Sequence, residues 1–361
     1  MNNICIYTKN IINFFNKIIN DIIIFFNNNT YNTNDESNDE SNDKIIIDNK
    51  YNIKNNVNLV NINEIIKNNN YYNHKYVITN NVAILFCIAN FKGNDNDLTY
   101  PVNDAITMIL ELMDHNFTIF ILGDNLINQS LLGKSTSLEK NGVSHEKINM
   151  FNKKMNNYNN KIYFYYAYES NLYNIINIIK TNINEPKNQN TFIYFSGHGT
   201  QTNENKIDET NSSICDINFK DISEYDIINK IIIPFNDFKN TIIIYDNCCS
   251  GGLLDSLKSY DMNNIFVMSA SSYDGFGYDD DTSKHGLLTS YLLINIDMLF
   301  NKNDNSDNLF NYNKLKQMYD DICDSYIKKS ESEIQIDDNY KKDYPMCYIN
   351  GKLYDYTNYK S

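Results

Sequence analysis

The sequence predicts an α/β fold, a three-layer α/β/α sandwich around a mostly parallel sheet of six strands. Two observations predict it. Short runs of Ile, Val and aromatic residues, typical of buried strands, alternate with segments whose apolar residues recur at helical spacing. The order strand, helix, strand at 82–89, 103–113 and 117–122 also favours parallel strands joined by right-handed crossovers. We therefore expect one large α/β domain over residues 76–361.

The remaining elements follow in chain order. Further strands are expected at 191–195, 241–245, 265–270 and 346–349, and the weakly alternating segment 161–168 is interpreted as an extra strand or a hairpin arm. Further helices are expected at 172–183, 223–232, 286–299 and 313–327. Segment 125–160 is polar and shows no firm pattern, so it is interpreted as a functional loop or a disordered connection.

Residues 1–75 are expected to form an N-terminal extension. Its apolar segment 11–26 is interrupted by Asn13, Lys17 and Asp21, so it is too polar for a clear membrane span and lacks the features of a signal peptide. A helix packed on the domain, or a membrane-surface segment, is the better interpretation. Residues 27–44 are acidic, Asn-rich and of low complexity, which is typical of a disordered linker.

Composition narrows the function classes. The chain has 361 residues and a net charge of −14, and it contains no arginine. A nucleic-acid binder would show a basic stripe, so nucleic acid is not an expected partner. Seven cysteines spread over a long chain do not form a disulfide framework, which favours a reducing, cytoplasmic setting. The five histidines are scattered and no Cys-x-x-Cys pair occurs, so no structural zinc site is expected.

Two of the predicted strands end in small residues that carry one reactive side chain each. The predicted strand 191–195 is followed by Ser196-Gly-His198-Gly199, and the predicted strand 241–245 by Asp246-Asn-Cys248. Ligands and chemistry gather at the carboxyl ends of strands in an open parallel sheet. A thiol is mostly protonated at neutral pH, and a neighbouring imidazole can deprotonate it and later protonate a leaving amine. Backbone N–H groups at the two turns, those of Gly199 and Cys248, are the expected oxyanion hole.

The sequence resembles the metacaspases, caspase-fold cysteine peptidases. Residues 194–201, Tyr-Phe-Ser-Gly-His-Gly-Thr-Gln, resemble the family's Tyr-Ser-Gly-His-Gly-Ser-Gln motif, and residues 246–251, Asp-Asn-Cys-Cys-Ser-Gly, resemble its Asp-x-Cys-His-Ser-Gly motif. The separation, 248 − 198 = 50 residues, is also typical of caspases. The resemblance extends over residues 82–349 and implies a caspase-like fold with a large-subunit region at about 76–260 and a small-subunit region at about 261–361.

The resemblance also implies an activity and the residues that perform it. Cys248 would be the nucleophile and His198 its partner, in an endopeptidase that cleaves after Lys or Arg. Asp104, Ser196 and Asp246 match the family's primary pocket, and two carboxylates in a cleft would attract a basic side chain. The expected partners are therefore peptide or protein substrates with basic residues, and the family implies a monomer.

Calcium activates many members of the family, although the chemistry requires no cofactor. The matching positions are Asn211, Glu224, Tyr225 and Asp255, of which only Glu224 and Asp255 are carboxylates. Since Ca²⁺ favours several charged oxygens, we expect a weakened site or none. Self-processing between the two subunit regions would have to occur at lysine, with Lys258 and Lys284 as candidates.

Other interpretations stay open at this point. Cys249 stands where the family has a histidine, which favours a catalytically silent caspase-like module that acts through protein contacts. A nucleotide-binding protein is a weaker alternative because no Gly-x-Gly-x-x-Gly follows a strand. Asp104 could be an ordinary acid at a helix N-terminus. The acidic run 279–281 is expected to be a solvated loop, and His285 a surface or loop residue.

Overall fold

The computed structural model describes residues 59–61, 76–92, 97–132, 139–158, 161–201, 212–300, 309–333 and 343–360. The expected apolar segment 11–26 and the expected linker 27–44 lie outside the described residues. Of the helices in the described part of the chain, none combines the length and the apolar character needed to cross a membrane.

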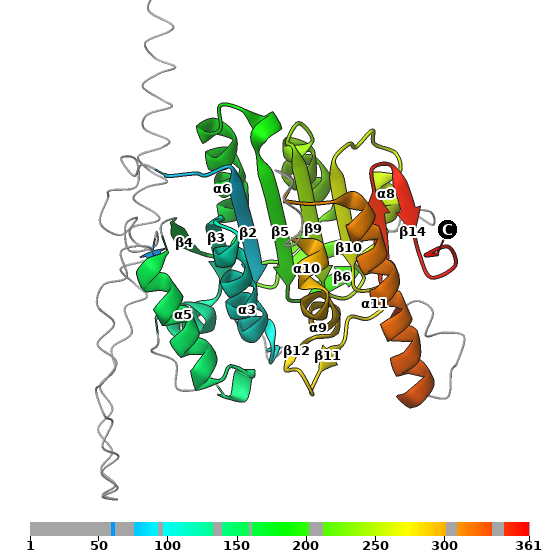
Figure 1. The fold of residues 1–361 in the computed structure, drawn as a ribbon, viewed down its shortest axis with the longest axis horizontal. Coiled ribbons are helices and arrows are strands. Elements are labelled where there is room, and N and C mark those ends of the chain that lie inside the picture. Colours follow the sequence, from blue (N-terminus) through cyan, green and yellow to red (C-terminus); the bar gives the residue numbers. More distant parts are fainter. Residues whose placement is uncertain are drawn as a thin grey trace, which may run out of the picture. The chain divides into compact units, whose positions relative to one another are not determined.

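The predicted α/β sandwich is confirmed, with a central sheet of nine strands instead of six (Figure 1). The strand order is β1-β4-β3-β2-β5-β9-β10-β13-β14. From β1 to β10 all neighbours are parallel, whereas β13 and β14 are antiparallel. The strands are β1 (Leu59–Asn61), β2 (Asn81–Cys87), β3 (Thr118–Gly123), β4 (Ile162–Tyr166), β5 (Asn190–Ser196), β9 (Asn240–Asp246), β10 (Ile265–Ser269), β13 (Met346–Ile349) and β14 (Lys352–Tyr354).

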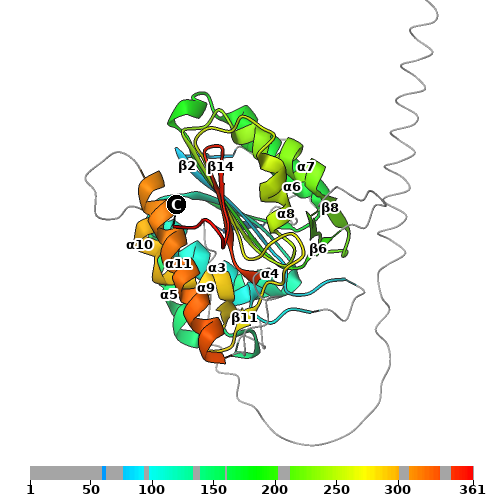
Figure 2. The same ribbon diagram turned by 90° about the vertical axis from the view of Figure 1, so that its right-hand side faces the viewer.

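Helices cover both faces of this sheet (Figure 2). Successive residues of each strand point to opposite faces, so that Leu85 and Cys87 join one buried cluster and Ile84 and Phe86 the other. One face is covered by α3 (Pro101–Asp114), α4 (Asn125–Leu131), α5 (His145–Asn157), α9 (Leu287–Ile294), α10 (Ile296–Leu299) and α11 (Tyr312–Glu333). The other is covered by α6 (Glu169–Asn182), α7 (Glu224–Asp226) with a π-helical turn over Ile227–Ile232, and α8 (Gly251–Leu257).

The expectation of a loop at 125–160 was wrong, because two helices lie in it. The Asp124 carboxylate accepts a hydrogen bond from Ile127 N at 2.9 Å and begins α4. The Ser144 hydroxyl accepts one from Lys147 N at 3.1 Å and begins α5. Only Ile148, Phe151 and Met155 of α5 are buried, and Asn and Lys residues between them obscure the helical period.

Several shorter elements also differ from expectation. The segment 161–168 holds β4, a parallel strand of the main sheet and not a hairpin arm. Two small sheets were not foreseen. One consists of β6 (Gly199–Gln201), β7 (Ser212–Cys215) and β8 (Asp221–Ser223), and the other of β11 (Asp279–Asp280) and β12 (His285–Gly286). Both contain strands of only two to four residues, too short to show a period in the sequence.

Candidate active site

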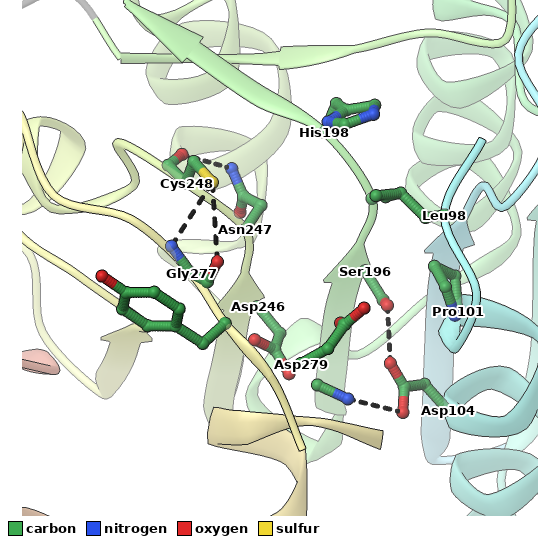
Figure 3. A pocket seen from close by; sticks show the side chains of 13 residues that line it. Leu98, Pro101, Asp104, Ser196, His198, Asp246, Asn247, Cys248, Gly277 and Asp279 are labelled. Atoms are coloured by element: carbon green, nitrogen blue, oxygen red, sulfur yellow. Dashed lines mark hydrogen bonds between the residues drawn. The ribbon is translucent and has the colours of Figure 1, made fainter. Parts of the chain in front are cut away.

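A pocket of about 100 Å³ lies beyond the carboxyl ends of β5 and β9 (Figure 3). It brings together five of the predicted site residues, which come from α3 and from the two strand ends. The lining residues are Leu98, Pro101, Asp104, Ser196, Gly197, His198, Asp246, Asn247, Cys248, Gly277, Tyr278, Asp279 and Gly286.

The pairing of β5 with β9 brings His198 and Cys248 to the same pocket. The two strands are parallel neighbours, and their register pairs Asn190 with Asn240 and Ser196 with Asp246. Every pair is offset by 50 residues, since 246 − 196 = 50. His198 and Cys248 keep the same offset and follow their strands by two residues each. The 50-residue separation of His198 and Cys248 therefore equals the offset at which β5 pairs with β9.

Gly199 allows the two strand ends to approach closely. A Cβ atom at this position would lie 2.1 Å from Asn247 Nδ2 and 2.1 Å from the Cys248 carbonyl oxygen. No side chain fits at these distances, so this position requires glycine. The Asn247 amide also donates to the Cys248 carbonyl at 3.1 Å, which holds the turn that carries the thiol.

The Cys248 thiol lies against Gly277. The Gly277 N–H donates to Sγ at 3.3 Å, and Sγ lies 3.8 Å from the Gly277 carbonyl oxygen. Burial raises the pKa of the thiol; the Gly277 N–H opposes this, while the Asp246 and Asp279 carboxylates add to it. At neutral pH the resting thiol is therefore protonated, and ionisation requires a base.

Two aromatic rings and a backbone hydrogen bond position His198 after β5. Its ring centroid lies 5.0 Å from that of Phe91 and 5.4 Å from that of Phe219. Its carbonyl accepts a hydrogen bond from Cys215 N at 3.0 Å, which ties the turn to the small sheet β6-β7-β8. Two aromatic rings thus pack against the imidazole, which itself lines the pocket.

Cys249 has a left-handed backbone, with φ of 56°. A non-glycine residue rarely adopts this conformation, and the neighbouring chain maintains it. Cys249 N donates to the Gly275 carbonyl at 2.9 Å, and the Ser212 hydroxyl donates to the Cys249 carbonyl. Burial, with the nearby Cys248, raises the pKa of the Cys249 thiol to about 11. Cys249 therefore shapes the turn after Cys248, and its own thiol stays protonated.

Asp104 is almost fully buried, with an exposed fraction of 1%, and both of its carboxylate oxygens have partners within the chain. Oδ2 accepts from the Ser196 hydroxyl at 2.8 Å. Oδ1 lies 2.6 Å from His285 Nδ1 and accepts from Gly286 N at 3.3 Å. The prediction of a surface or loop position for His285 was wrong, because the short β11-β12 pairing folds it back against Asp104 with an exposed fraction of 5%.

Asp246 faces the same pocket from the end of β9. Both hydrogen bonds of its carboxylate go to Oδ2, from Thr289 N at 2.9 Å and from the Thr289 hydroxyl at 2.6 Å. A Cβ atom on Gly286 would lie 2.2 Å from Oδ2, so glycine is needed there as well. Burial, followed by the like charge of Asp104, raises the pKa of Asp246 to about 7.

Asp279 is a pocket residue that sequence reasoning missed. It lines the pocket together with Asp104 and Asp246 while its side chain stays exposed to solvent, so the run 279–281, which was expected to be a solvated loop, also forms part of the pocket. Partial burial, followed by the charge of Asp104, raises the pKa of Asp279 to about 6. No signal in the sequence distinguishes it from Asp280 and Asp281, because which of three adjacent acids points inward depends on the hairpin geometry.

Two of the predicted calcium positions, Glu224 and Asp255, have partners within the chain. Both carboxylate oxygens of Glu224 accept hydrogen bonds, Oε2 from Ser212 N at 2.9 Å and Oε1 from the Ser256 hydroxyl. Asp255 pairs with Lys258 at 2.7 Å. Asn211 lies outside the described residues. Across the described part of the chain, no group of three or more His, Cys, Asp or Glu side chains is placed to hold a metal ion.

Comparison with known proteins gives one family match. The family described as metacaspase, peptidase C14 domain, matches residues 134–257. No curated protein matches the chain. Among solved structures, the Drosophila initiator caspase Dronc is 8% identical with a TM-score of 0.45, over 77% of this chain and 83% of that one. Caspase-1 from Spodoptera frugiperda is 11% identical with a TM-score of 0.41, over 77% of this chain and 90% of that one.

The structural similarities are weak, so the family rests on the sequence match. The matched segment contains both strand ends, with Ser196, His198, Asp246 and Cys248. Asp104, Asp279 and His285 lie outside it. The chain is therefore similar to the metacaspase family of peptidase C14 over residues 134–257, the segment that carries both strand ends.

Proposed function

We propose that this protein is a cysteine endopeptidase that cleaves peptide bonds after Lys or Arg, with Cys248 as nucleophile and His198 as base. The observation that carries the proposal is the shared pocket. The register of β5 and β9 delivers the imidazole, the thiol and the carboxylate of Asp246 to one cavity, which Asp104 also lines. Reactive and recognition groups in one cleft are what a peptidase specific for basic residues requires.

The protonation state of the Cys248 thiol determines the first step of the proposed reaction. Because the thiol pKa is raised, Cys248 has to lose its proton to His198 as the sulfur attacks the scissile carbonyl carbon. The C–N bond then breaks, the amine leaves with the proton held by the imidazolium, and a thioester remains. Water, deprotonated by the same imidazole, attacks the thioester, which releases the acid and restores the thiol.

The developing oxyanion needs donors beside the nucleophile. The backbone N–H groups of Gly199 and Cys248 are the proposed donors, and the close approach of Gly199 to the Cys248 carbonyl supports this role. Preorganised donors of this kind contribute about 3 kcal/mol each to transition-state stabilisation.

The chemistry is proposed to need no cofactor, with a monomer in the cytoplasm as the acting species. All six cysteines in the described part of the chain are free thiols, which suits a reducing compartment. The edge strand β14 carries Lys352, and charged residues on edge strands oppose pairing with another copy.

A second candidate function is a caspase-like module without catalysis. The raised pKa of the Cys248 thiol and its contacts with Gly277 favour it, because a protonated, partly covered thiol is a weak nucleophile. Labelling with iodoacetamide at neutral pH separates the two. Cys248 reacting faster than the other cysteines, and slower in His198→Ala, would argue against the silent module.

Hydrolysis of fluorogenic peptides tests the proposed function. Peptides ending in Lys, Arg, Asp and norleucine before the fluorophore are compared at equal concentration. We expect cleavage of the Lys and Arg peptides only, and loss of more than about a thousandfold in Cys248→Ala and His198→Ala. Hydrolysis that survives either substitution would refute the dyad.

A further inference from the structure

The three acids of the run 279–281 differ in their partners. Asp280 lies 3.3 Å from the Lys329 ammonium and accepts from the Ser290 hydroxyl at 3.2 Å. Asp281 accepts a hydrogen bond from the Tyr100 hydroxyl. The Asp279 side chain has neither a hydrogen bond nor an ion pair with any residue in the described part of the chain, yet it lines the pocket beside Cys248 (Figure 3). Asp280 and Asp281 therefore brace the hairpin, whereas Asp279 has no such contact and faces the pocket.

Asp104, by contrast, already has a partner within the chain on each of its two carboxylate oxygens. Ser196 occupies Oδ2, and His285 and Gly286 occupy Oδ1. A cation at Asp104 would share these oxygens with the donors already present, so it gains less there than at an oxygen without a partner.

Asp246 retains an open oxygen. Both of its hydrogen bonds go to Oδ2, from Thr289, and within the described residues none goes to Oδ1. Its raised pKa has the same origin as that of Asp279, namely burial together with a neighbouring like charge.

The hairpin 279–286 brings Asp279 close to Asp246. Its two-residue ladder pairs Asp279 with Gly286 and Asp280 with His285. Gly286 lies directly against the Asp246 carboxylate, since a Cβ atom added to it would be 2.2 Å from Asp246 Oδ2. Its N–H donates to Asp104 Oδ1. The three carboxylates therefore surround one glycine, with Asp279 arriving from the strand opposite it.

We propose that Asp279 and Asp246 together bind the cationic side chain of the substrate, and that Asp104 and His285 position the pocket wall without contacting the cation. This rests on the proposed function, and it makes Asp279 a specificity-determining residue outside the segment that matches the family. An ammonium has three donors that can reach oxygens on two separate residues, so a lysine side chain fits this pair.

Binding to a protein without its nucleophile tests the proposal directly. Full-length Cys248→Ala protein is titrated with a fluorescein-labelled tetrapeptide amide ending in lysine, and with the same peptide ending in norleucine. Asp279→Asn is then introduced and both titrations are repeated. The four dissociation constants form a double-mutant cycle, which isolates the coupling between the Asp279 charge and the lysine ammonium. Asp281→Asn is the matched control, because it removes the same charge from the same hairpin at a residue paired with Tyr100.

We expect Asp279→Asn to weaken lysine-peptide binding about tenfold more than norleucine-peptide binding, and Asp281→Asn to change the two by less than about twofold relative to each other. Equal coupling in the two variants, or lysine-peptide binding no stronger than norleucine-peptide binding in the parent, would overturn the proposal. The peptidase assay is independent: if protein with intact Cys248 hydrolyses nothing while the coupling persists, the proposed function fails and the pocket assignment stands. Circular dichroism confirms that each variant is folded.

Discussion

The two strand ends and the hairpin 279–286 reach the same pocket by different physical routes. His198 and Cys248 follow β5 and β9, whose residues are buried at the centre of the sheet. Their positions are set by core packing and by a seven-residue register. The hairpin has a ladder of only two residue pairs, and polar contacts hold it in place. The nucleophile is therefore fixed by the hydrophobic core, whereas the charge of the pocket depends on a few hydrogen bonds that mutation can change separately.

The largest expected effect is at the strand ends. Gly199→Ala forces a Cβ into the Asn247 amide and the Cys248 carbonyl, both 2.1 Å away, and must push the two turns apart. We expect a loss of hydrolysis of more than about a hundredfold. Gly197→Ala is the matched control in the same turn, since its Cβ would have 3.6 Å to its nearest neighbour, the Ile88 carbonyl oxygen. Equal losses in the two variants would show that the approach of Gly199 is not what matters.

Asp246→Asn separates recognition from stability. Loss of the charge should lower kcat/KM for a lysine peptide about tenfold. Because the folded-state pKa of Asp246 is raised from 3.8 to about 7, the carboxylate costs stability as the pH rises through this range. The variant should thus gain about 1 kcal/mol or more in free energy of unfolding at a pH near 8 and nothing near pH 4. Urea unfolding at both pH values measures it, and destabilisation at the higher pH would contradict the account.

Substitutions of His285 test the contact between the hairpin 279–286 and Asp104. His285→Leu removes the partner of a buried carboxylate and should raise KM for a lysine peptide and lower the free energy of unfolding by about 3 kcal/mol. His285→Gln can still donate to Asp104 Oδ1 and should recover most of both losses. If Gln fails to rescue KM while restoring stability, His285 does more than position Asp104.

The smallest effect is expected from calcium removal. The two described candidate carboxylates already have intrachain partners, Glu224 with Ser212 and Ser256 and Asp255 with Lys258. Adding a calcium chelator should change the hydrolysis rate by less than about twofold. A loss of activity that calcium restores would place a site elsewhere, and isothermal titration with calcium would measure its affinity.

The fold was predictable where one kind of side chain dominates a segment. Strands β2, β3, β5, β9 and β10 are continuous apolar runs, and the sequence predicts each within a few residues. Helix α5 was missed because three buried residues among Asn and Lys residues leave the period hidden. Strand β1 has three residues and pairs with β4 far along the chain, and no local pattern can indicate such a partner.

The site likewise contains residues that the sequence predicts and residues that it does not. The sequence predicts His198, Cys248, Ser196 and Asp246 at one sheet edge because parallel strand ends meet there, and the structure brings them to one pocket. It does not reveal Asp279 or His285. Their inward orientation depends on the β11-β12 pairing and on the contact with Asp104, which are tertiary features. Asp279 has the same composition signal as the two acids that follow it.

Covalent labelling tests the dyad and the acidic pocket together, because it requires the nucleophile, the base and the pocket carboxylates at once. The full-length protein is treated with an acyloxymethyl ketone of a peptide ending in lysine, or with its aspartate counterpart, and the modified residue is located by mass spectrometry. We expect one equivalent of label on Cys248 from the lysine reagent, almost none from the aspartate reagent, and strongly slowed labelling in His198→Ala. Equal labelling by both reagents, or lysine-reagent labelling of any other cysteine in preference to Cys248, would contradict this expectation.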